Sequence, residues 1–499
     1  MKTAREPHSG GRTPSGPLSG ALVASPTWLA PGGLNWKALA LASAGLVLIF
    51  TAPPHRLDLL LFGLVGLGGA LLWSPLAGPV LIGAALPVFF FSRQLVGPIS
   101  VTPPGLVLSL TWLAVLVNAA RARSSAEKCM SHAKGSPNSV QTDCLEGRLR
   151  GRRLFGRPAR LLLRWPRSTY ALPVAAFLAA ALLSLLVTEY PVLSIRELRA
   201  LIFEPVLFFW LLHTLRGSPS LALAGFLAGA TLTALAAVAQ GPLGIGGTPA
   251  EGVLRAQAWY PSANHLALML GRAWPFLVAG AFAGWRWLWL PAGLVGLALL
   301  LTFSTGGWLG GVTGVLVVLI GLGRRRLGLR LGAVAAVALV LVSTLAIVGI
   351  LPERLNPLRQ TGGFRLDLWL SSVDMLRDHV VLGIGLDNFA YLYQQVYLRE
   401  GAAAEPNLSH PHNWLLHVWL ELGLLGLVAF VWLVVRFGQQ ARARLRTSST
   451  RWIVAGACGS MTDLLVHGWI DNSYFLVDLA FAFWLVVALV STEGRIDST

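Results

Sequence analysis

Charged side chains are scarce in this chain of 499 residues: Asp, Glu, Lys and Arg make up 12% of it, whereas hydrophobic residues make up 55%. A soluble domain is about a quarter charged, and a single soluble core stops growing near about 250–300 residues. The composition therefore excludes a soluble enzyme, a disordered protein and a fibrous protein, and it favours a polytopic membrane protein. Cysteine is also scarce, and three residues, Cys129, Cys144 and Cys458, cannot build a disulfide framework.

Acidic residues are fewer than basic ones: the chain has 22 Asp and Glu and 39 Lys and Arg, which gives a formal net charge of +17. With the N-terminus inside, the loops predicted to be cytoplasmic hold 28 of the 39 basic and 6 of the 22 acidic residues. This asymmetry follows the positive-inside rule. The excess of positive charge thus predicts an inside N-terminus, an inside C-terminus and attraction to anionic lipid, rather than a nucleic-acid partner.

Apolar runs of about 16–24 residues, long enough to cross about 30 Å of hydrocarbon, recur along the chain. They predict an all-α polytopic protein of about 14 transmembrane helices. The predicted spans are 36–52, 57–73, 75–92, 104–120, 169–187, 196–214, 219–240, 263–283, 286–303, 307–322, 329–350, 413–435, 452–470 and 474–491.

These spans divide the chain into seven parts. The sequence predicts a disordered cytoplasmic tail, N-terminal spans, a basic cytoplasmic linker, central spans, an extracytoplasmic loop, C-terminal spans and a tail: 1–35, 36–120, 121–168, 169–350, 351–412, 413–491 and 492–499. The linker contains Cys129, His132 and Cys144, which we interpret as free thiols and a lone histidine because a zinc site needs a fourth ligand and tighter spacing.

The predicted outer loop, 351–412, is far longer than a connecting turn, and loops of that length are usually functional or disordered. Within 364–379, apolar residues recur at helical spacing, which predicts an amphipathic helix. The residues of this predicted face are Leu366, Trp369, Leu370, Val373 and Leu376.

Ionisable and polar residues also occur inside the predicted spans, where they usually face a bundle interior or a cavity. Four-residue spacing places Asn413, His417 and Glu421 on one helix face, and Asp463, His467 and Asp471 on another. A third span carries Asn264 and Arg272. The pattern predicts a polar centre that opens outward; a purely structural ion pair of Arg272 with Glu421 or Asp463 is the alternative.

His410 and His412 lie where the outer loop meets a span. A histidine with a pKa near 6.5 can take a proton from a hydroxyl, or orient that hydroxyl, at neutral pH. Arginines on the predicted outer side could bind phosphate, although spacing alone does not select among them.

The region from Leu254 to Phe483 resembles the O-antigen ligase / O-antigen polymerase superfamily of bacterial membrane glycosyltransferases. The shared motifs are Arg255 with Pro261-Ser-Ala-Asn264, Thr302-Phe-Ser304, Arg365 with Trp369, Leu382-Gly-Ile-Gly-Leu-Asp-Asn-Phe389, and His410-Pro-His-Asn413 followed by Glu421-Leu-Gly423 and Gly426. The string His-x-His-Asn…Glu-Leu-Gly after a long loop is the most specific of them.

The resemblance implies transfer of a glycan from undecaprenyl diphosphate to an acceptor hydroxyl at the outer face of the cytoplasmic membrane, in cell-surface polysaccharide or lipopolysaccharide assembly. It implies phosphate binding by Arg255 and Arg365, with Arg272 as a further candidate, and an acceptor-side role for His412 with His410 beside it. No cofactor is implied; the partners are the lipid-linked donor, a glycan, lipid or protein acceptor, and the bilayer. One residue departs from the pattern, because Thr305 follows Ser304 where members often have an arginine.

Several alternatives remain open from the sequence. A polysaccharide polymerase and a protein O-oligosaccharyltransferase share the same motifs, and a small-solute transporter or a non-catalytic scaffold would belong to other classes. His410, His412 and Glu405 could be assembled into a metal site, but such clusters arise easily in outer loops, and we expect an enzyme that works without a metal.

Overall fold

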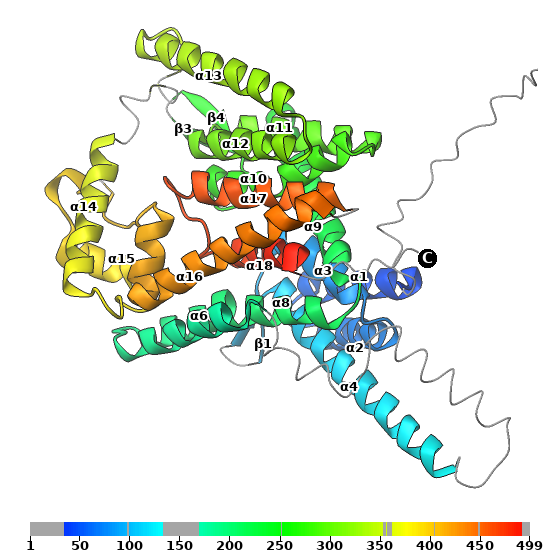
Figure 1. Ribbon diagram of the computed structural model, residues 1–499. Coiled ribbons are helices and arrows are strands. Elements are labelled where there is room, and N and C mark those ends of the chain that lie inside the picture. Colours follow the sequence, from blue (N-terminus) through cyan, green and yellow to red (C-terminus); the bar gives the residue numbers. More distant parts are fainter. Residues whose placement is uncertain are drawn as a thin grey trace, which may run out of the picture.

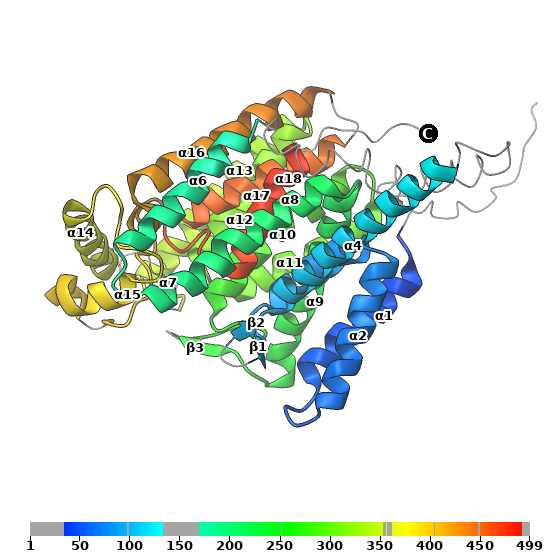
Figure 2. The ribbon, with the colours of Figure 1, turned by 90° about the horizontal axis from the view of Figure 1, so that it is seen from below.

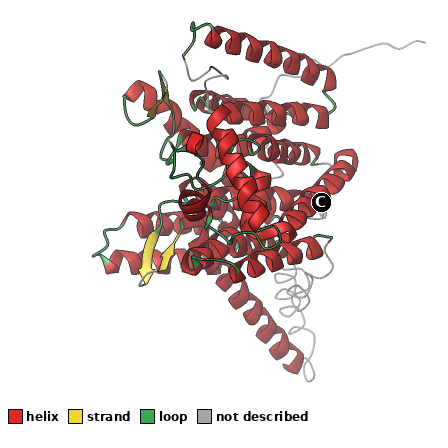
Figure 3. Ribbon diagram, turned by 90° about the vertical axis from the view of Figure 1, so that its left-hand side faces the viewer, coloured by secondary structure: helices red, strands yellow, loops and turns green. Residues whose placement is uncertain are grey.

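The computed structural model describes residues 34–96, 99–132, 169–250, 252–352, 356, 362–403, 405–447 and 450–491. These residues form a helical bundle, which confirms the all-α prediction (Figures 1 and 3). The described strands form two small antiparallel hairpins, β1 (Arg93–Val96) with β2 (Ile99–Val101) and β3 (Thr248–Ala250) with β4 (Val253–Arg255).

The helices follow the apolar runs of the sequence, and each predicted span contains one. They are α1 (Trp36–Thr51), α2 (Leu57–Trp73), α3 (Ala77–Ala85), α4 (Pro103–His132), α6 (Ala171–Leu183), α7 (Pro191–Glu197), α8 (Glu204–Thr214), α9 (Ser218–Leu243), α10 (Ala263–Phe282), α11 (Trp289–Leu301), α12 (Thr305–Gly321), α13 (Arg325–Ile347), α14 (Gly362–Asp378), α15 (Phe389–Leu392), α16 (Trp414–Thr447), α17 (Arg451–His467) and α18 (Val477–Ser491).

Five of the described helices are long and apolar enough to cross a membrane by length and composition. They lie at Pro103–Ser125, Ser218–Leu243, Ala263–Phe282, Arg325–Ile347 and Trp414–Arg446. Seven further apolar helices have 10–17 residues. The structure therefore supports a multi-helix membrane architecture, whereas the number of about 14 crossing helices remains a prediction.

Three helices at the centre of the bundle, α10, α12 and α17, pack on one another (Figure 1). α10 carries Asn264 and Arg272, and α17 carries Asp463 and His467. Glycines let these helices approach closely: a Cβ added at Gly314 of α12 would lie 2.7 Å from the carbonyl oxygen of Gly459 in α17. Small residues at helix contacts are a usual feature of membrane bundles, because no hydrophobic effect drives helices together in lipid.

Helices α14 and α15 form a separate layer at one end of the bundle, at the left of Figure 1. They share a small apolar cluster that includes Leu368, Met375 and Tyr393 and that reaches Leu420 of α16. The predicted helix at 364–379 is thus present as α14, but its buried face differs from the predicted one. Leu366 and Leu370 are exposed, since small Ser371 and Ser372 face the interior together with Leu368 and Met375.

Helix α4 continues to His132, so the first residues of the predicted linker 121–168 are helical rather than a loop. The predicted tails lie almost wholly outside the described residues, as do Cys144 and the greater part of the linker. Figure 2 shows that α4 extends beyond the helices around it and that α1 and α2 form a pair at the edge of the bundle.

Candidate active site

The polar site lies where several helices begin or end. α10 and α12 begin there, α16 begins there, and α17 ends there at His467. Two loops meet in front of these ends: 409–413, which precedes α16, and 468–476, which joins α17 to α18. Because helix ends carry unpaired backbone groups, their convergence brings polar backbone and side chains to one place in an apolar bundle.

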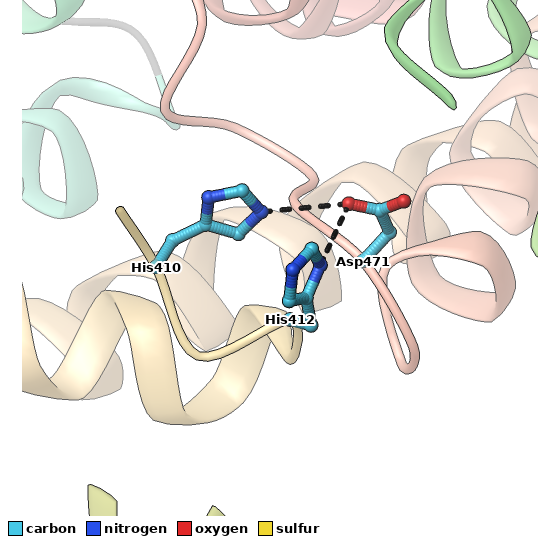
Figure 4. Close-up of side chains that lie close together, drawn as sticks. All are labelled: His410, His412 and Asp471. Atoms are coloured by element: carbon cyan, nitrogen blue, oxygen red, sulfur yellow. Dashed lines mark hydrogen bonds and ion pairs between the residues drawn. The ribbon is translucent and has the colours of Figure 1, made fainter. Parts of the chain in front are cut away.

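His410, His412 and Asp471 form a hydrogen-bonded cluster between these two loops (Figure 4). Nδ1 of His412 lies 3.2 Å from Oδ1 of Asp471, and Nε2 of His410 lies 3.5 Å from the same oxygen. The backbone N–H of Asn472 donates to that oxygen as well, at 2.8 Å. Since Nδ1 of His412 faces a carboxylate, the neutral ring carries its proton on Nδ1, and Nε2 is left as a base.

The loop that carries the two histidines is held from three directions. Trp369 of α14 donates its indole N–H to the carbonyl of Pro411 at 3.1 Å. Asn413 caps α16 by accepting from the backbone of Leu415 and Leu416, and the N–H of Trp414 donates to Gly468 at 2.7 Å. These contacts hold loop 409–413 against loop 468–476.

His412 has a backbone φ of +50°. This left-handed conformation is uncommon for residues other than glycine, although Asn, Asp and His adopt it more often than most, and residues held in it concentrate at functional sites. The histidine predicted to engage the acceptor is therefore held by the contacts around it in a conformation that the free chain disfavours.

The electrostatics of the cluster favour an ionised carboxylate of Asp471 beside a neutral ring of His410. Burial by itself would raise the pKa of Asp471, but hydrogen bonds from His410 and His412 outweigh it and hold that pKa well below its usual range. Burial, with a smaller contribution from the neighbouring His412, lowers the pKa of His410 to about 4. The side chain of His412 is 16% exposed, so it is the ring of the two more open to a substrate.

A polar pocket adjoins the cluster. Residues from α10, the start of α12, α14, the end of α17 and loop 468–476 line it: Asn264, Ser304, Thr305, Gly306, Arg365, His467, Ile470 and Asp471. The pocket is small, with a cavity volume of about 20 Å³, whereas small-molecule pockets usually enclose about 300–1,000 Å³. It therefore suits a single small group rather than a whole glycan.

Arg255 approaches the same region from strand β4. Its Nε donates to the carbonyl of Thr302 at 2.7 Å, and its Nη2 donates to Oδ1 of Asn264 at 2.6 Å. Arg255 and Asn264 were predicted separately, as a phosphate ligand and as a cavity residue, and the structure brings them together beside the turn before α12.

Arg272 lies deeper, in the interior of α10. It is 1% exposed, and its guanidinium forms an ion pair with Asp463 of α17 and donates to the carbonyl of Ser473 at 3.4 Å. Of the two structural partners expected from the sequence, Asp463 is the one present. Neither Arg272 nor Asp463 lines the pocket; diphosphate binding by Arg272 stays a prediction.

His417 and Glu421 lie on α16 behind the cluster. The ring of His417 stacks on that of His410 with centroids 5.6 Å apart, and its Nε2 is 3.5 Å from Oε1 of Glu421. The other oxygen of Glu421 accepts the backbone N–H of Asp387 at 2.6 Å. Glu421 therefore holds loop 383–388 against α16.

Two details of the sequence interpretation are wrong. Asp471 does not share a helix face with Asp463 and His467, because α17 ends at His467 and Gly468 follows as its cap. Asn413 likewise precedes α16 as a cap rather than forming part of its face. The predicted set also missed Ile470 and the start of α12 as pocket walls, although Thr302-Phe-Ser304 had marked that turn.

The three clustered side chains could also supply metal ligands, since one ligand atom from each lies within 4.8 Å of the others. Both imidazoles, however, approach the same carboxylate oxygen, which is the arrangement of a hydrogen-bonded cluster. Glu405, which the sequence suggested as a third ligand, is not a member of this group.

The fold and site define a helical membrane protein with a histidine–carboxylate cluster beside a small polar pocket. Residues 290–431 match a family model described as O-Antigen ligase. This match supports assignment to the O-antigen ligase family, and with it a ligase- or polymerase-type function in general. The matched part includes Thr305, Arg365, His410, His412 and Glu421, and it ends before His467 and Asp471. A comparison with curated proteins gave no match.

Proposed function

We propose that the protein transfers a glycan from an undecaprenyl-diphosphate donor to an acceptor hydroxyl at the outer face of the cytoplasmic membrane. The observation that carries the proposal is the His412–Asp471 contact at 3.2 Å beside a pocket lined by Arg365. Asp471 contacts the proposed base, His412, and lines the same pocket as the cation Arg365. The match to the O-antigen ligase family supports the same class of reaction.

In the proposed reaction, Nε2 of His412 accepts the proton of the acceptor hydroxyl while Asp471 stabilises the resulting imidazolium. The hydroxyl oxygen forms a bond to the anomeric carbon of the donor as the bond from that carbon to the diphosphate oxygen breaks. The electron pair leaves with the diphosphate, whose growing charge is stabilised by fixed cations. A single displacement inverts the configuration at the anomeric carbon.

Each arginine has a distinct part in this scheme. Arg365 lines the pocket directly and supplies a permanent positive charge, because a guanidinium remains protonated at any physiological pH. Arg255 holds Asn264 and the carbonyl of Thr302, and so supports the wall of the pocket as well as its charge. Neither residue needs a metal ion to neutralise the leaving group, and we propose metal-independent transfer.

The test is a transfer assay in membranes that contain an undecaprenyl-diphosphate-linked glycan and a candidate acceptor fraction. His412→Ala should lower the rate by about 10²–10⁴-fold, the usual contribution of general acid–base catalysis, and Arg365→Ala should also abolish most transfer. Arg377→Ala is the matched control, since Arg377 is exposed on the same helix and pairs with Asp374. Added EDTA should leave the wild-type rate unchanged.

The products decide among related activities. One transfer per acceptor indicates a ligase, a ladder of products indicates a polymerase, and a labelled protein indicates a protein O-oligosaccharyltransferase. Normal transfer by folded His412→Ala would refute the role given to His412. Transport of a small solute by the wild type, without transfer to any acceptor, would refute the proposed reaction.

A further inference from the structure

His467, the last residue of α17, lines the pocket but has no part in the mechanism above. Its side chain is fully buried, and among the described residues neither Nδ1 nor Nε2 has a hydrogen-bond partner. Buried polar groups are almost always hydrogen-bonded, because leaving one unpaired is costly. A neutral imidazole carries one N–H donor, so this ring is suited to an acceptor that enters the pocket.

The ring of His467 faces the first turn of α12. A Cβ added at Gly306 would lie 2.5 Å from Cδ2 and 2.9 Å from Nε2 of His467. Any residue larger than glycine at this position would therefore collide with the ring. The same turn lines the pocket through Ser304, Thr305 and Gly306. α12 has 17 residues, and Ser304 is its cap.

The chemistry of these walls selects an anion. The first N–H groups of a helix have no partner within it and carry the positive end of its dipole, which makes this end a ready site for phosphate. Arg365 adds a full positive charge. The one opposing charge in the lining, Asp471, directs Oδ1 toward His412 and the N–H of Asn472.

We infer that His467 donates a ring N–H to an oxygen of a phosphate group bound at the first turn of α12, opposite Arg365. The inference rests on the proposed function in taking the lipid diphosphate as the source of that phosphate. In this arrangement the neutral His467, the first turn of α12 and Arg365 bind the phosphate together.

Binding of isoprenoid diphosphate tests the inference without requiring catalysis. Purified protein in lipid nanodiscs is titrated calorimetrically with farnesyl diphosphate and, separately, with inorganic pyrophosphate. His467→Leu should weaken binding by about tenfold or more, as loss of a hydrogen bond to a charged group does. His467→Gln, which keeps an N–H donor, should recover part of the loss.

Gly306→Ala gives a second approach that keeps the histidine. The added methyl group should displace the ring and weaken binding by a similar factor. Gly293→Ala on α11 is its matched control, because a Cβ there meets nothing within 4 Å. His213→Gln is the control for replacement of a partly buried histidine outside the pocket, since His213 bonds to Ser491 instead.

The outcomes separate this inference from the proposed function. Wild-type affinity in Gly306→Ala, or in a His467→Leu protein with an unchanged melting temperature, would overturn the inference even if transfer proceeds. Dependence of binding on His467 and Gly306, without transfer by the wild type, would support it and count against the proposed function. Tighter binding of farnesyl diphosphate than of pyrophosphate would assign the phosphate to a lipid. Equal affinities would assign it to a free anion and would overturn the inference that a lipid supplies the phosphate.

Discussion

At the scale of single residues, the account depends on how one carboxylate serves two histidines. Oδ1 of Asp471 accepts from His412 at 3.2 Å and is 3.5 Å from His410, and the N–H of Asn472 fixes its orientation. His412 is the more exposed of the two rings, and its φ of +50° is maintained by the surrounding loop. Asp471 is thus a positioning residue that selects the proton-bearing nitrogen of His412.

Asp471→Asn tests this role with little change of shape. An amide can donate as well as accept, so the ring of His412 can take the tautomer in which Nε2 carries the proton and cannot act as a base. We expect transfer to fall by about 10²-fold or more, through kcat rather than KM. Steady-state kinetics of the purified variant measure the effect, and an unchanged kcat would contradict the tautomer argument.

The low pKa of His410 predicts a dependence of stability on pH. Burial lowers this pKa to about 4, whereas the unfolded chain binds the proton with a pKa near about 6.5. Acidification through that window therefore favours the unfolded state, and stability is lost as the pH falls from about 6.5 toward 4. At still lower pH the Asp471 carboxylate, whose pKa is held low by the histidines, is protonated, and further stability is lost.

The corresponding measurement is the melting temperature of purified protein between pH 7 and pH 4. His410→Gln should show a flatter dependence than the wild type, because the variant has no imidazole to protonate there. His379→Gln, just after α14 and outside the cluster, should follow the wild type. Parallel curves for all three proteins would show that His410 does not carry the effect.

At the scale of elements, α16 and loop 383–388 are joined by a break within the helix. Gly423 has φ +70° and ψ −176° inside α16, and the N–H of Leu424 donates to the carbonyl of Val381 at 3.0 Å. The N–H of Ile384 donates to Leu420 at 2.7 Å. The break therefore exposes helix backbone groups that bind the loop, and Glu421 adds its bond to Asp387.

Gly423→Ala should break this junction, because an L-residue is strained at that φ and the methyl group would collide with the carbonyl of Val381. We expect a loss of at least about 1 kcal/mol of stability together with lower activity. Gly438→Ala lies on the same helix with nothing within 4 Å of the added Cβ. Thermal unfolding of both variants makes the comparison, and equal melting temperatures would contradict the account of the break.

The elements also show what the sequence can and cannot predict. The apolar runs located helices correctly, and the polar residues of the spans predicted an ion pair of Arg272 with Glu421 or Asp463, of which the pair with Asp463 is present. The roles given to His412 and Asp471 stay predictions, and the helical spacing that placed Asp471 on one face with Asp463 and His467 was wrong. The end of α17 at His467 was not predictable from periodicity, since it depends on contacts such as the bond from Trp414 to Gly468. The buried face of α14 depends likewise on Leu420 of α16, which is remote in sequence.

At the scale of the whole molecule, the two ends of α12 differ in character. Its first turn lines the site, and the basic segment that leads into α13 follows its last turn. Arg325 and Arg326 begin α13, whose apolar side chains are mostly exposed, as expected of a helix that faces lipid (Figure 1). The positive-inside rule predicts that this arginine-rich end is cytoplasmic and that residues 351–412 are extracytoplasmic.

Cysteine labelling tests that orientation. Glu400→Cys and Arg326→Cys introduce thiols at exposed positions on the two predicted sides, and the wild type supplies the background of the native cysteines. A membrane-impermeant maleimide should label Glu400→Cys in intact spheroplasts, and it should label Arg326→Cys only after permeabilisation. The reverse pattern would invert the topology and place the site on the cytoplasmic side.

The most direct test of the central claim is transfer by the purified protein in liposomes. The donor is a synthetic undecaprenyl-diphosphate-linked saccharide, and both glycosylated acceptor and released undecaprenyl diphosphate are quantified. The account predicts equal amounts of the two products, an inverted anomeric centre, and neither product with His412→Ala. Folded wild-type protein that releases no diphosphate, or a His412→Ala protein that matches its rate, would contradict it.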